Sequence, residues 1–263
     1  MDKLWMWGYT LTEIPQKCDY VYASEGSYCS LETAAEFLNA DNAIFMNTAE
    51  DLGNLTEEQF KYLENCKEVI CSLSHGKYVE SAKAIAEFSK KHTNITGVII
   101  DDFLMYDKPS SNMTVEELKE VYTALKDGNP NLKLWVVRYS RHDLDEIDPY
   151  LDYIDGINFW IWNTTEHYWK AVYKDDIIKL QKKGKPIIQG VFLHDFGEDF
   201  LAPMSVENLK LQMPKIADCY RLGQLEGIVF LQNGWLNRED HREAVQWTKS
   251  YWEWFFGTLT VRK

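Results

Sequence analysis

Two adjacent aspartates, Asp101 and Asp102, directly follow the apolar segment Gly97–Ile100. Removing neighbouring carboxylates from water is unfavourable, and their mutual repulsion should raise the pKa of one of them. A carboxyl with a raised pKa can donate a proton while an ionised neighbour stabilises positive charge, which is how glycoside cleavage divides the work. We expect Asp102 to act as general acid and Asp101 to orient a substrate or stabilise developing charge. In the alternative, one aspartate caps the following loop and the other pairs with a basic residue such as Arg138.

Standard two-carboxylate hydrolysis needs a second acidic side chain, and the sequence offers several. Asp195 and Glu25 are the leading candidates because each follows a predicted strand, and Asp143 and Asp107 stand behind them. Each could equally be an ordinary solvated acid. The distance between the two carboxylates decides between retention and inversion, and spacing in the sequence does not give that distance.

Aromatic residues are the unusual part of the composition, at 14% with 10 Trp and 15 Tyr. Such a surplus serves carbohydrate stacking, a partner surface or extended aromatic packing. Aromatic and polar residues gather where predicted strands end, as a sugar-sized cleft above an apolar core would need. The predicted substrate-binding residues are Trp7, Tyr9, His75, Arg138, Asn158, Trp160, Trp162, His194, Gln232 and Trp235. The tryptophans late in the chain would stack on sugar rings, and the polar residues would bind hydroxyl or acidic groups.

Histidine and serine chemistry have weaker support in the sequence. His75, His142 and His194 follow predicted strands, and with Asp101 they could form the site of a metal-assisted hydrolase. No HxH, HExxH or helix-spaced ligand pair occurs, and no GxSxG motif marks a serine nucleophile. We therefore predict neither a metal nor another cofactor.

Short apolar segments alternate with longer amphipathic ones, which is typical of parallel strands connected by helices. The predicted strands are Leu4–Tyr9, Tyr20–Ser24, Ala43–Thr48, Val69–Ser74, Gly97–Phe103, Leu134–Tyr139, Ile157–Trp162, Ile187–Leu193 and Ile228–Gln232. Capping-box spacings at Thr56 with Gln59 and at Thr114 with Glu117 predict helix starts. A Trp-rich final helix, Glu239–Phe256, is expected to lie against the strands.

This alternation predicts an α/β protein, a single (β/α)8 TIM barrel over residues 1–263, because such barrels typically take ~250 residues. Nine strand candidates are one too many, and either Tyr20–Ser24 or Ala43–Thr48 should lie outside the barrel. An open doubly wound sheet is the alternative, but the sequence has no GxGxxG or GxxxxGK[ST] loop. In a barrel, chemistry belongs at the carboxyl ends of the strands, where the candidate residues stand.

The net charge and the lengths of the apolar runs argue against nucleic acid and membranes as partners. The 263 residues carry 28 Lys+Arg and 41 Asp+Glu, a net charge of −13, which disfavours nucleic acid and anionic membrane surfaces. No apolar run approaches the roughly 20 residues that span a bilayer. The five scattered cysteines predict mostly free, buried thiols. No signal peptide precedes the first predicted strand, so the protein is cytoplasmic if the chain is complete and secreted if a signal was removed.

Five segments, in this order, resemble the family 18 chitinase-like glycoside hydrolases: Val69–Gly76, Gly97–Phe103, Tyr153–Trp162, Ile187–Phe196 and Leu225–Trp235. In that family an S-x-G-G strand precedes a D-G-x-D-x-D-x-E strand, and a tryptophan on the last strand floors the sugar subsite. With Gly97 on the motif glycine, Asp101 takes the third acid, whereas Phe103 stands where the family has its proton-donating Glu. Trp235 looks like the subsite tryptophan, and Asn158 and Trp160 fall where the family holds its substrate.

The sequence therefore predicts a glycoside hydrolase-like enzyme that cleaves O-glycosidic bonds of a carbohydrate by carboxylate acid/base chemistry. Two alternatives remain. One is a non-catalytic carbohydrate-binding barrel, which the phenylalanine at Phe103 favours, and the other is a metal-assisted hydrolase that uses His75, His194 and Asp101.

Overall fold

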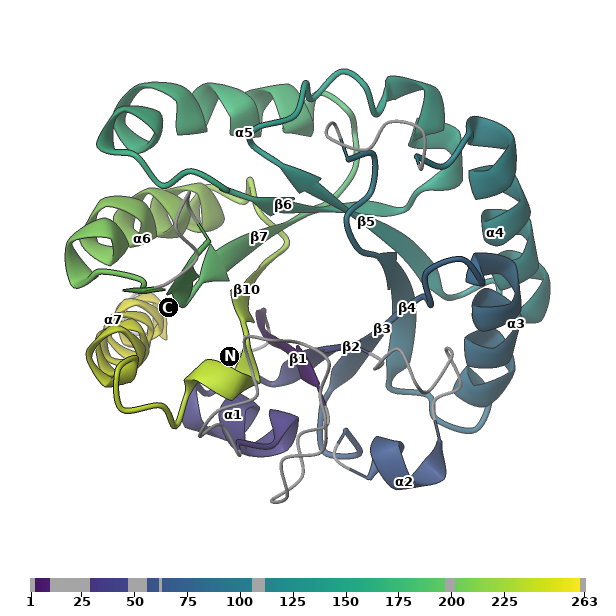
Figure 1. Cartoon of the computed structure of the whole chain (residues 1–263), viewed down its shortest axis with the longest axis horizontal. Coiled ribbons are helices and arrows are strands. Elements are labelled where there is room, and N and C mark those ends of the chain that lie inside the picture. The colour runs from purple at the N-terminus through teal and green to yellow at the C-terminus, as the bar shows by residue number, and fades with distance from the viewer. Residues whose placement is uncertain are drawn as a thin grey trace.

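A computed structural model describes the chain over residues 3–9, 29–46, 56–61, 63–105, 112–196 and 202–260. Within these ranges eight parallel strands close into a barrel, which confirms the predicted (β/α)8 architecture (Figure 1). The barrel strands are β1 Leu4–Tyr9, β2 Asn42–Met46, β3 Glu68–Ser72, β4 Ile95–Ile100, β5 Lys133–Tyr139, β6 Gly156–Trp160, β7 Ile187–Phe192 and β10 Gly227–Leu231. Around the barrel they follow the order β1–β10–β7–β6–β5–β4–β3–β2.

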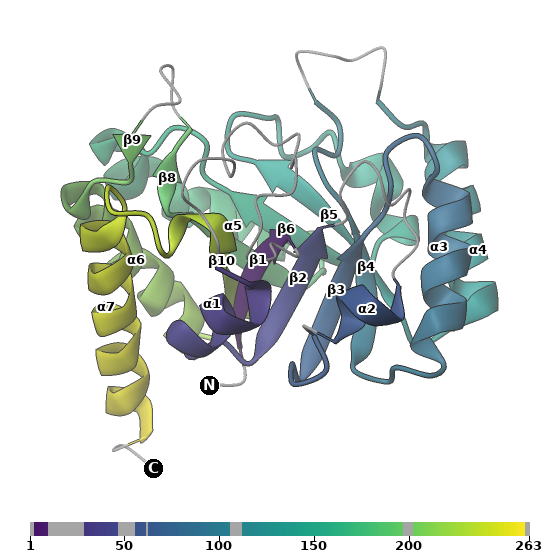
Figure 2. The same ribbon diagram turned by 60° about the horizontal axis from the view of Figure 1, so that its bottom comes forward.

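Helices cover the outside of the barrel, as a parallel sheet buried on both faces requires (Figure 2). They are α1 Leu31–Phe37, α2 Glu57–Phe60, α3 Tyr78–Ser89, α4 Val115–Gly128, α5 Tyr173–Gln181, α6 Val206–Arg221 and α7 Arg242–Thr260, with the shorter η3 Asp148–Tyr153, η4 Tyr168–Val172 and η5 Asn233–Trp235. After β7, an antiparallel hairpin pairs β8 His194–Asp195 with β9 Ala202–Pro203. None of the described helices is long and apolar enough to cross a membrane.

The two predicted capping boxes are present. At the start of α2, the Thr56 hydroxyl accepts a hydrogen bond from the Gln59 amide at 3.2 Å, and the Gln59 side chain accepts one from the Thr56 amide at 2.9 Å. Thr114 and Glu117 form the same reciprocal pair at the start of α4. These bonds satisfy backbone amides that the first helical turn leaves without partners, so both helix starts are fixed locally by the sequence.

The core fills the barrel and the layer between the barrel and its helices. Strands β1 and β7 are buried along their whole length, which explains why both alternating sets of side chains are apolar in β1 and, apart from Gln189, in β7. The last helix, α7, begins at Arg242 rather than at the predicted Glu239. The ring centroid of its buried Trp252 lies 6.3 Å from that of Phe230 in β10. The Trp-rich helix therefore packs against the barrel, as expected.

The strand predictions need one correction. Of the two candidates for the extra strand, Ala43–Thr48 supplies β2 within the barrel, and Tyr20–Ser24 lies outside the described residues. Strand β4 ends at Ile100 instead of continuing to Phe103. The reason is local backbone geometry, because Asp102 has a φ of 50°, which an extended strand does not adopt. Consecutive aspartates are therefore not forced onto opposite faces of a strand.

Candidate active site

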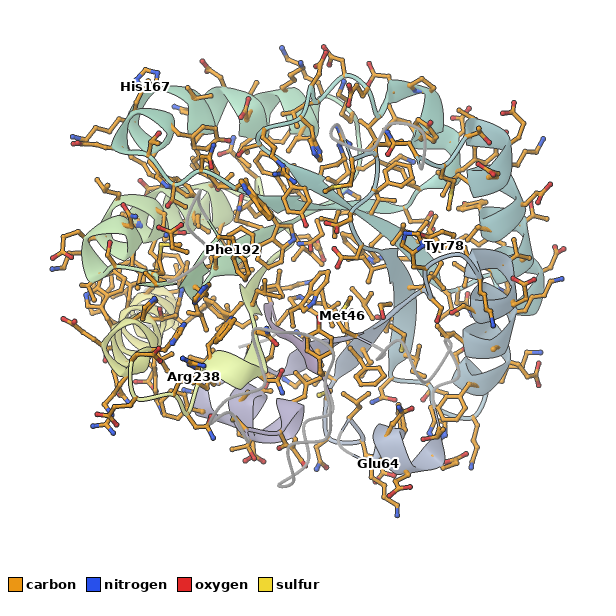
Figure 3. All side chains as sticks on the ribbon, viewed as in Figure 1. Met46, Glu64, Tyr78, His167, Phe192 and Arg238 are labelled. Carbon is orange, nitrogen blue, oxygen red and sulfur yellow. The ribbon has the colours of Figure 1, made fainter. Side chains whose placement is uncertain are left out.

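A cavity of about 120 Å³ lies at the carboxyl end of the barrel. It is lined by Trp7, Tyr9, Asp101, Asp102, Tyr139, Trp160, Trp162, Phe192, Phe196 and Leu231. Nine of these residues belong to the ends of six barrel strands or follow them closely, and Phe196 directly follows β8. In the end-on view of Figure 3, Phe192 and Met46 lie toward the barrel centre, whereas Glu64 and His167 lie on the outer edge. Six predicted site residues are thus brought together in one cavity where a barrel supports chemistry.

Three aromatic rings form one wall of the cavity. The Trp160 ring lies edge-to-face against Trp7, with centroids 5.6 Å apart, and 4.7 Å from Phe192. Its indole nitrogen donates to the Asn158 carbonyl oxygen at 2.6 Å, and the Asn158 amide donates to a β7 carbonyl. Gly190 makes room for the ring, since a Cβ there would lie 2.0 Å from an indole carbon. Asn158 is itself fully buried, so it orients Trp160 and does not line the cavity.

Trp162 supplies a second aromatic surface, and one of its faces is already occupied. The Arg141 guanidinium lies over the Trp162 ring, 4.0 Å from its centroid. Tyr139 contacts the same ring edge-to-face at 5.2 Å. Trp162 is only half-buried, so these neighbours fix the orientation of a ring that a ligand can still reach.

Both aspartates of the β4 end face the cavity. Asp101 is half-buried, and the backbone amide of the exposed Asp102 donates to its Oδ1 at 2.9 Å. The Tyr139 hydroxyl donates to Asp102 Oδ1 at 2.6 Å. Burial, together with the neighbouring charge of Asp102, raises the pKa of Asp101 to about 8, and the hydrogen bond from the Asp102 amide offsets part of this effect. Asp101 is therefore a carboxyl that keeps its proton at neutral pH.

Arg138 braces the segment that carries the aspartates. Its side chain is fully buried, and its guanidinium donates to the carbonyl oxygens of Phe103 at 2.9 Å and Leu104 at 3.1 Å. Glu146 is its carboxylate partner, at 3.1 Å. Arg138 thus neither lines the cavity nor pairs with an aspartate of the β4 end, contrary to both sequence-based expectations for it. It positions the turn in which Leu104, like Asp102, has a positive φ.

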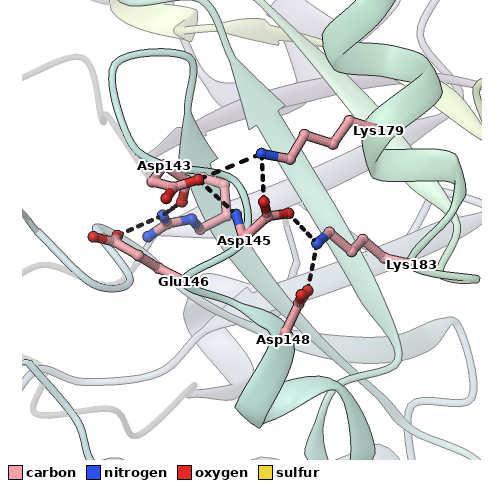
Figure 4. A network of polar contacts seen from close by, with 7 residues as sticks. Asp143, Asp145, Glu146, Asp148, Lys179 and Lys183 are labelled. Carbon is pink, nitrogen blue, oxygen red and sulfur yellow. Dashed lines mark hydrogen bonds and ion pairs between the residues drawn. The ribbon is translucent and has the colours of Figure 1, made fainter.

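Asp143, one of the reserve carboxylates, belongs to an ion-pair network outside the cavity (Figure 4). Lys179 contacts Asp143 at 3.4 Å and Asp145 at 2.8 Å, and Lys183 contacts Asp145 at 2.6 Å and also Asp148. An amide hydrogen bond from Asp145 and the Lys179 ammonium lower the pKa of Asp143. These contacts join the segment after β5 to helix α5, so this network is structural.

His194 and Trp235 were expected to bind substrate, but both lie in a buried cluster beside the cavity. Trp235 is 2% exposed and stacks on His194 at 4.5 Å and on His241 at 4.8 Å. His194 Nδ1 lies 2.9 Å from His241 Nε2, and His241 Nδ1 lies 2.7 Å from Asp240. Arg238 in turn donates to Asp240 at 2.8 and 3.0 Å. Because their rings are stacked against each other and against His241, neither His194 nor Trp235 lines the cavity. The cluster instead holds the loop before α7 against β8.

The remaining predicted residues are dispersed. His75 is exposed near Tyr78, and Asp195 is a half-buried residue of β8; neither lines the cavity. Gln232 is fully buried, and neither polar atom of its side chain has a hydrogen-bond partner among the described residues. Glu25 and Asp107 lie outside the described residues. No three histidine, cysteine, aspartate or glutamate side chains in the described ranges could hold a metal, so His75, His194 and Asp101 do not assemble as the metal-site alternative required.

Sequence reasoning missed four residues of the cavity lining: Tyr139, Phe192, Phe196 and Leu231. Tyr139 is the last residue of β5, and the rule that selected strand ends applies to it directly. The charged or basic residues Arg138, Arg141 and His142 lie in the same stretch, and candidates were chosen among them instead of Tyr139. The other three are apolar, so nothing in their chemistry separates them from the core.

No protein-family model matches the sequence, and no curated protein matches it either. Solved structures are similar in fold. A putative alpha-L-fucosidase from Bacteroides thetaiotaomicron has a TM-score of 0.61 at 12% identity, and the aligned region covers 97% of this chain and 94% of the fucosidase chain. A family 5 mannosidase from Rhizomucor miehei has a TM-score of 0.55 at 13% identity, with coverages of 84% and 86%. A psychrophilic family 10 endo-beta-1,4-xylanase has a TM-score of 0.54 at 10% identity, with coverages of 94% and 96%.

At such low identity these similarities establish the fold alone. They place the chain among (β/α)8 barrels, a group in which unrelated chemistries share one scaffold. Any functional conclusion must therefore come from the cavity itself.

Proposed function

We propose that the protein is a glycoside hydrolase-like enzyme that cleaves O-glycosidic bonds of a carbohydrate. The observation that carries this proposal is a carboxyl with a raised pKa, Asp101, beside a second carboxylate, Asp102, in an aromatic cavity at the carboxyl end of the barrel. A neutral carboxyl can protonate a glycosidic oxygen, and a nearby carboxylate can stabilise an oxocarbenium-like transition state. The similar folds of a putative fucosidase, a mannosidase and a xylanase agree with this choice.

The surroundings of the two aspartates favour Asp101, not Asp102, as the general acid, which reverses the roles expected from the sequence. With its pKa raised to about 8, Asp101 holds a proton at neutral pH. Asp102 is exposed and accepts a hydrogen bond from the Tyr139 hydroxyl. Trp160 and Trp162 offer ring surfaces on which the apolar face of a sugar can stack.

A panel of aryl glycosides and short oligosaccharides tests the proposal with wild type and Asp101→Asn, each with and without EDTA. Wild type should release sugar from at least one member whether or not EDTA is present. In Asp101→Asn, kcat/KM should fall by about 10²–10⁴-fold on poor leaving groups and far less on dinitrophenyl glycosides, whose leaving group needs no proton. Asp175→Asn, an exposed position on α5, should match wild type.

Three outcomes would overturn the proposal or part of it. Tryptophan fluorescence that saturates with sugar, without turnover of any panel member, would instead establish a carbohydrate-binding barrel. Activity lost to EDTA and restored by a divalent ion would establish a metal-assisted hydrolase. An equal loss of kcat/KM on all leaving groups in Asp101→Asn would remove Asp101 from the role of acid.

A further inference from the structure

Asp101 supplies an acid, and among the described residues no carboxylate other than that of the adjacent Asp102 lines the cavity. In two-carboxylate glycosidases the acid and its partner flank the scissile bond. Asp101 and Asp102 are consecutive residues at one strand end, joined by the 2.9 Å hydrogen bond from the Asp102 amide to Asp101 Oδ1. All other described lining residues are aromatic or leucine. Tyr139 also lines the cavity, and its hydroxyl is hydrogen-bonded to Asp102, so among the described residues it is a candidate for the second catalytic group.

We propose that Tyr139 is the catalytic nucleophile and that Asp102 is its base, an inference that rests on the glycoside hydrolase function proposed above. The Tyr139 hydroxyl donates to Asp102 Oδ1 at 2.6 Å, which is within the reach that a nucleophile and its base require. Tyrosine can serve in place of a carboxylate, since sialidases use a tyrosine nucleophile. A phenol is a weak nucleophile until it loses its proton, and Asp102 is placed to take that proton.

The surroundings of Tyr139 hold its ring in place and put a cation beside it. The ring is 7% exposed and meets His142 and Trp162 edge-to-face, at centroid distances of 5.4 and 5.2 Å. The Arg141 guanidinium lies 5.3 Å from the ring centroid. A cation at that distance stabilises the negative charge that develops on the phenol as its proton leaves, and the packed ring needs no reorganisation during attack.

The proposed reaction has two steps in which atoms and charges balance. In the first, the Tyr139 oxygen bonds to the anomeric carbon and passes its proton to Asp102, while Asp101 gives its proton to the departing glycosidic oxygen. This forms a glycosyl–tyrosine ether and releases the aglycone alcohol. In the second step, Asp101 accepts a proton from water as the water oxygen bonds to the anomeric carbon, and the tyrosine oxygen departs and recovers its proton from Asp102. The sugar leaves with its original anomeric configuration, and both aspartates return to their starting states.

Covalent trapping tests the proposal directly. The probe is the 2-deoxy-2-fluoroglycosyl fluoride of whichever sugar the panel identifies, because such probes slow the second step and leave the nucleophile labelled. Peptide mass spectrometry of the inactivated full chain should find the sugar on Tyr139, and product analysis by NMR should show retained configuration. Tyr139→Phe should lose on the order of 10³-fold or more in kcat and should not be labelled.

A matched control separates this role from a merely structural Tyr–Asp hydrogen bond. Tyr168 donates to Asp176 at the same 2.6 Å distance but does not line the cavity, so Tyr168→Phe should keep wild-type kcat and labelling. In Tyr139→Ala, azide should restore turnover and give a glycosyl azide of inverted configuration, an outcome that a structural role would not produce.

The outcomes distinguish this inference from the function on which it rests. A label on another residue, such as Asp102, Asp195 or Glu25, would overturn the role of Tyr139 and leave the glycosidase function standing. An inverted product, or an unlabelled enzyme that still turns over, would do the same. No turnover on any glycoside would overturn both.

Discussion

Asp101 and Asp240 both lie at the carboxyl end of the barrel, yet their surroundings shift their pKa values in opposite directions. Asp240 accepts two hydrogen bonds from Arg238 and lies 2.7 Å from His241, and these partners lower its pKa well below its usual range. Asp101 has a carboxylate as its neighbour, and no basic side chain pairs with it among the described residues. Burial and repulsion therefore raise its pKa to about 8.

This difference separates an acid used for structure from one available for chemistry. Around Asp240 every polar contact fixes a loop, and the stacked His194, Trp235 and His241 rings are closed to ligands. Around Asp101 the described residues supply one backbone amide but no cation, and the carboxyl faces a cavity lined largely by aromatic rings. A perturbed pKa in a cleft is a marker of function, whereas a satisfied ion-pair network perturbs a pKa for structural reasons.

The largest expected effect is on the pH dependence of activity. Wild-type kcat/KM should fall about tenfold per pH unit above pH 8, because Asp101 can donate a proton only while it holds one. In Asp101→Asn the remaining activity should lack this alkaline decline, whereas Asp240→Asn should retain it. Steady-state rates on a poor leaving group from pH 5 to 10 measure this difference. An alkaline decline that survives in Asp101→Asn would show that another group supplies the proton.

The next largest effect distinguishes the tryptophans of the two regions. Trp235→Ala should cost about 3–5 kcal/mol of unfolding free energy, because it empties a nearly fully buried site. Trp162→Ala should cost much less but raise KM several-fold, since an aromatic contact is worth about 0.5–1.5 kcal/mol. Urea denaturation and steady-state kinetics on both variants check this. Loss of sugar affinity in Trp235→Ala at unchanged stability would return Trp235 to the substrate-binding role expected from the sequence.

A smaller effect is expected on the free energy of unfolding, which the ionisation of Asp101 lowers. The pKa of Asp101 is higher in the folded than in the unfolded chain, so its ionisation opposes folding as the pH rises from about 4 to 8. Asp101→Asn should therefore raise the unfolding free energy at pH 8 by on the order of 1–3 kcal/mol, less than the full shift implies because the half-buried side chain is partly screened by solvent. At pH 4 the gain should vanish. A variant that is destabilised at pH 8 would show that Asp101 has partners that the account lacks.

The smallest effect is expected in the histidine cluster. Burial lowers the pKa of His241 below its usual 6.5, although Asp240 partly opposes the shift. The unfolded chain then takes up a proton at higher pH than the folded chain, so stability should decline as the pH falls below about 6.5. His241→Gln should flatten this decline by less than about 1 kcal/mol between pH 6.5 and 5, as measured by urea denaturation. If His241→Gln leaves the pH dependence of the unfolding free energy unchanged, other groups cause the loss of stability in acid.

Much of the fold could be predicted from the sequence because its signals are local. The apolar runs of β1 and β7 reflect burial on both faces, and the capping pair Thr114 with Glu117 acts within four residues. The end of β4 was predicted too late, because the apolar pattern continues through Phe103 while the backbone already turns at Asp102. Backbone φ at a single residue leaves no trace in hydrophobic periodicity.

The candidate site could be predicted only in part, for a different reason. A strand-end rule finds Trp7, Asp101 and Trp160, since the barrel brings all strand ends together. The same rule cannot tell that Arg138 points to the carbonyls of a neighbouring segment, or that Trp235 is covered by two histidines. These outcomes depend on contacts between residues far apart in the chain.

The most direct test of the contrast between the two acids is a ¹³C NMR titration of the aspartate carboxyl carbons, with resonances assigned through Asp101→Asn and Asp240→Asn. We expect the Asp101 resonance to titrate near pH 8 and the Asp240 resonance to stay in its ionised position throughout the neutral and mildly acidic range. An Asp101 resonance that titrates near pH 4, as a solvated carboxyl does, would rule Asp101 out as the proton donor at neutral pH.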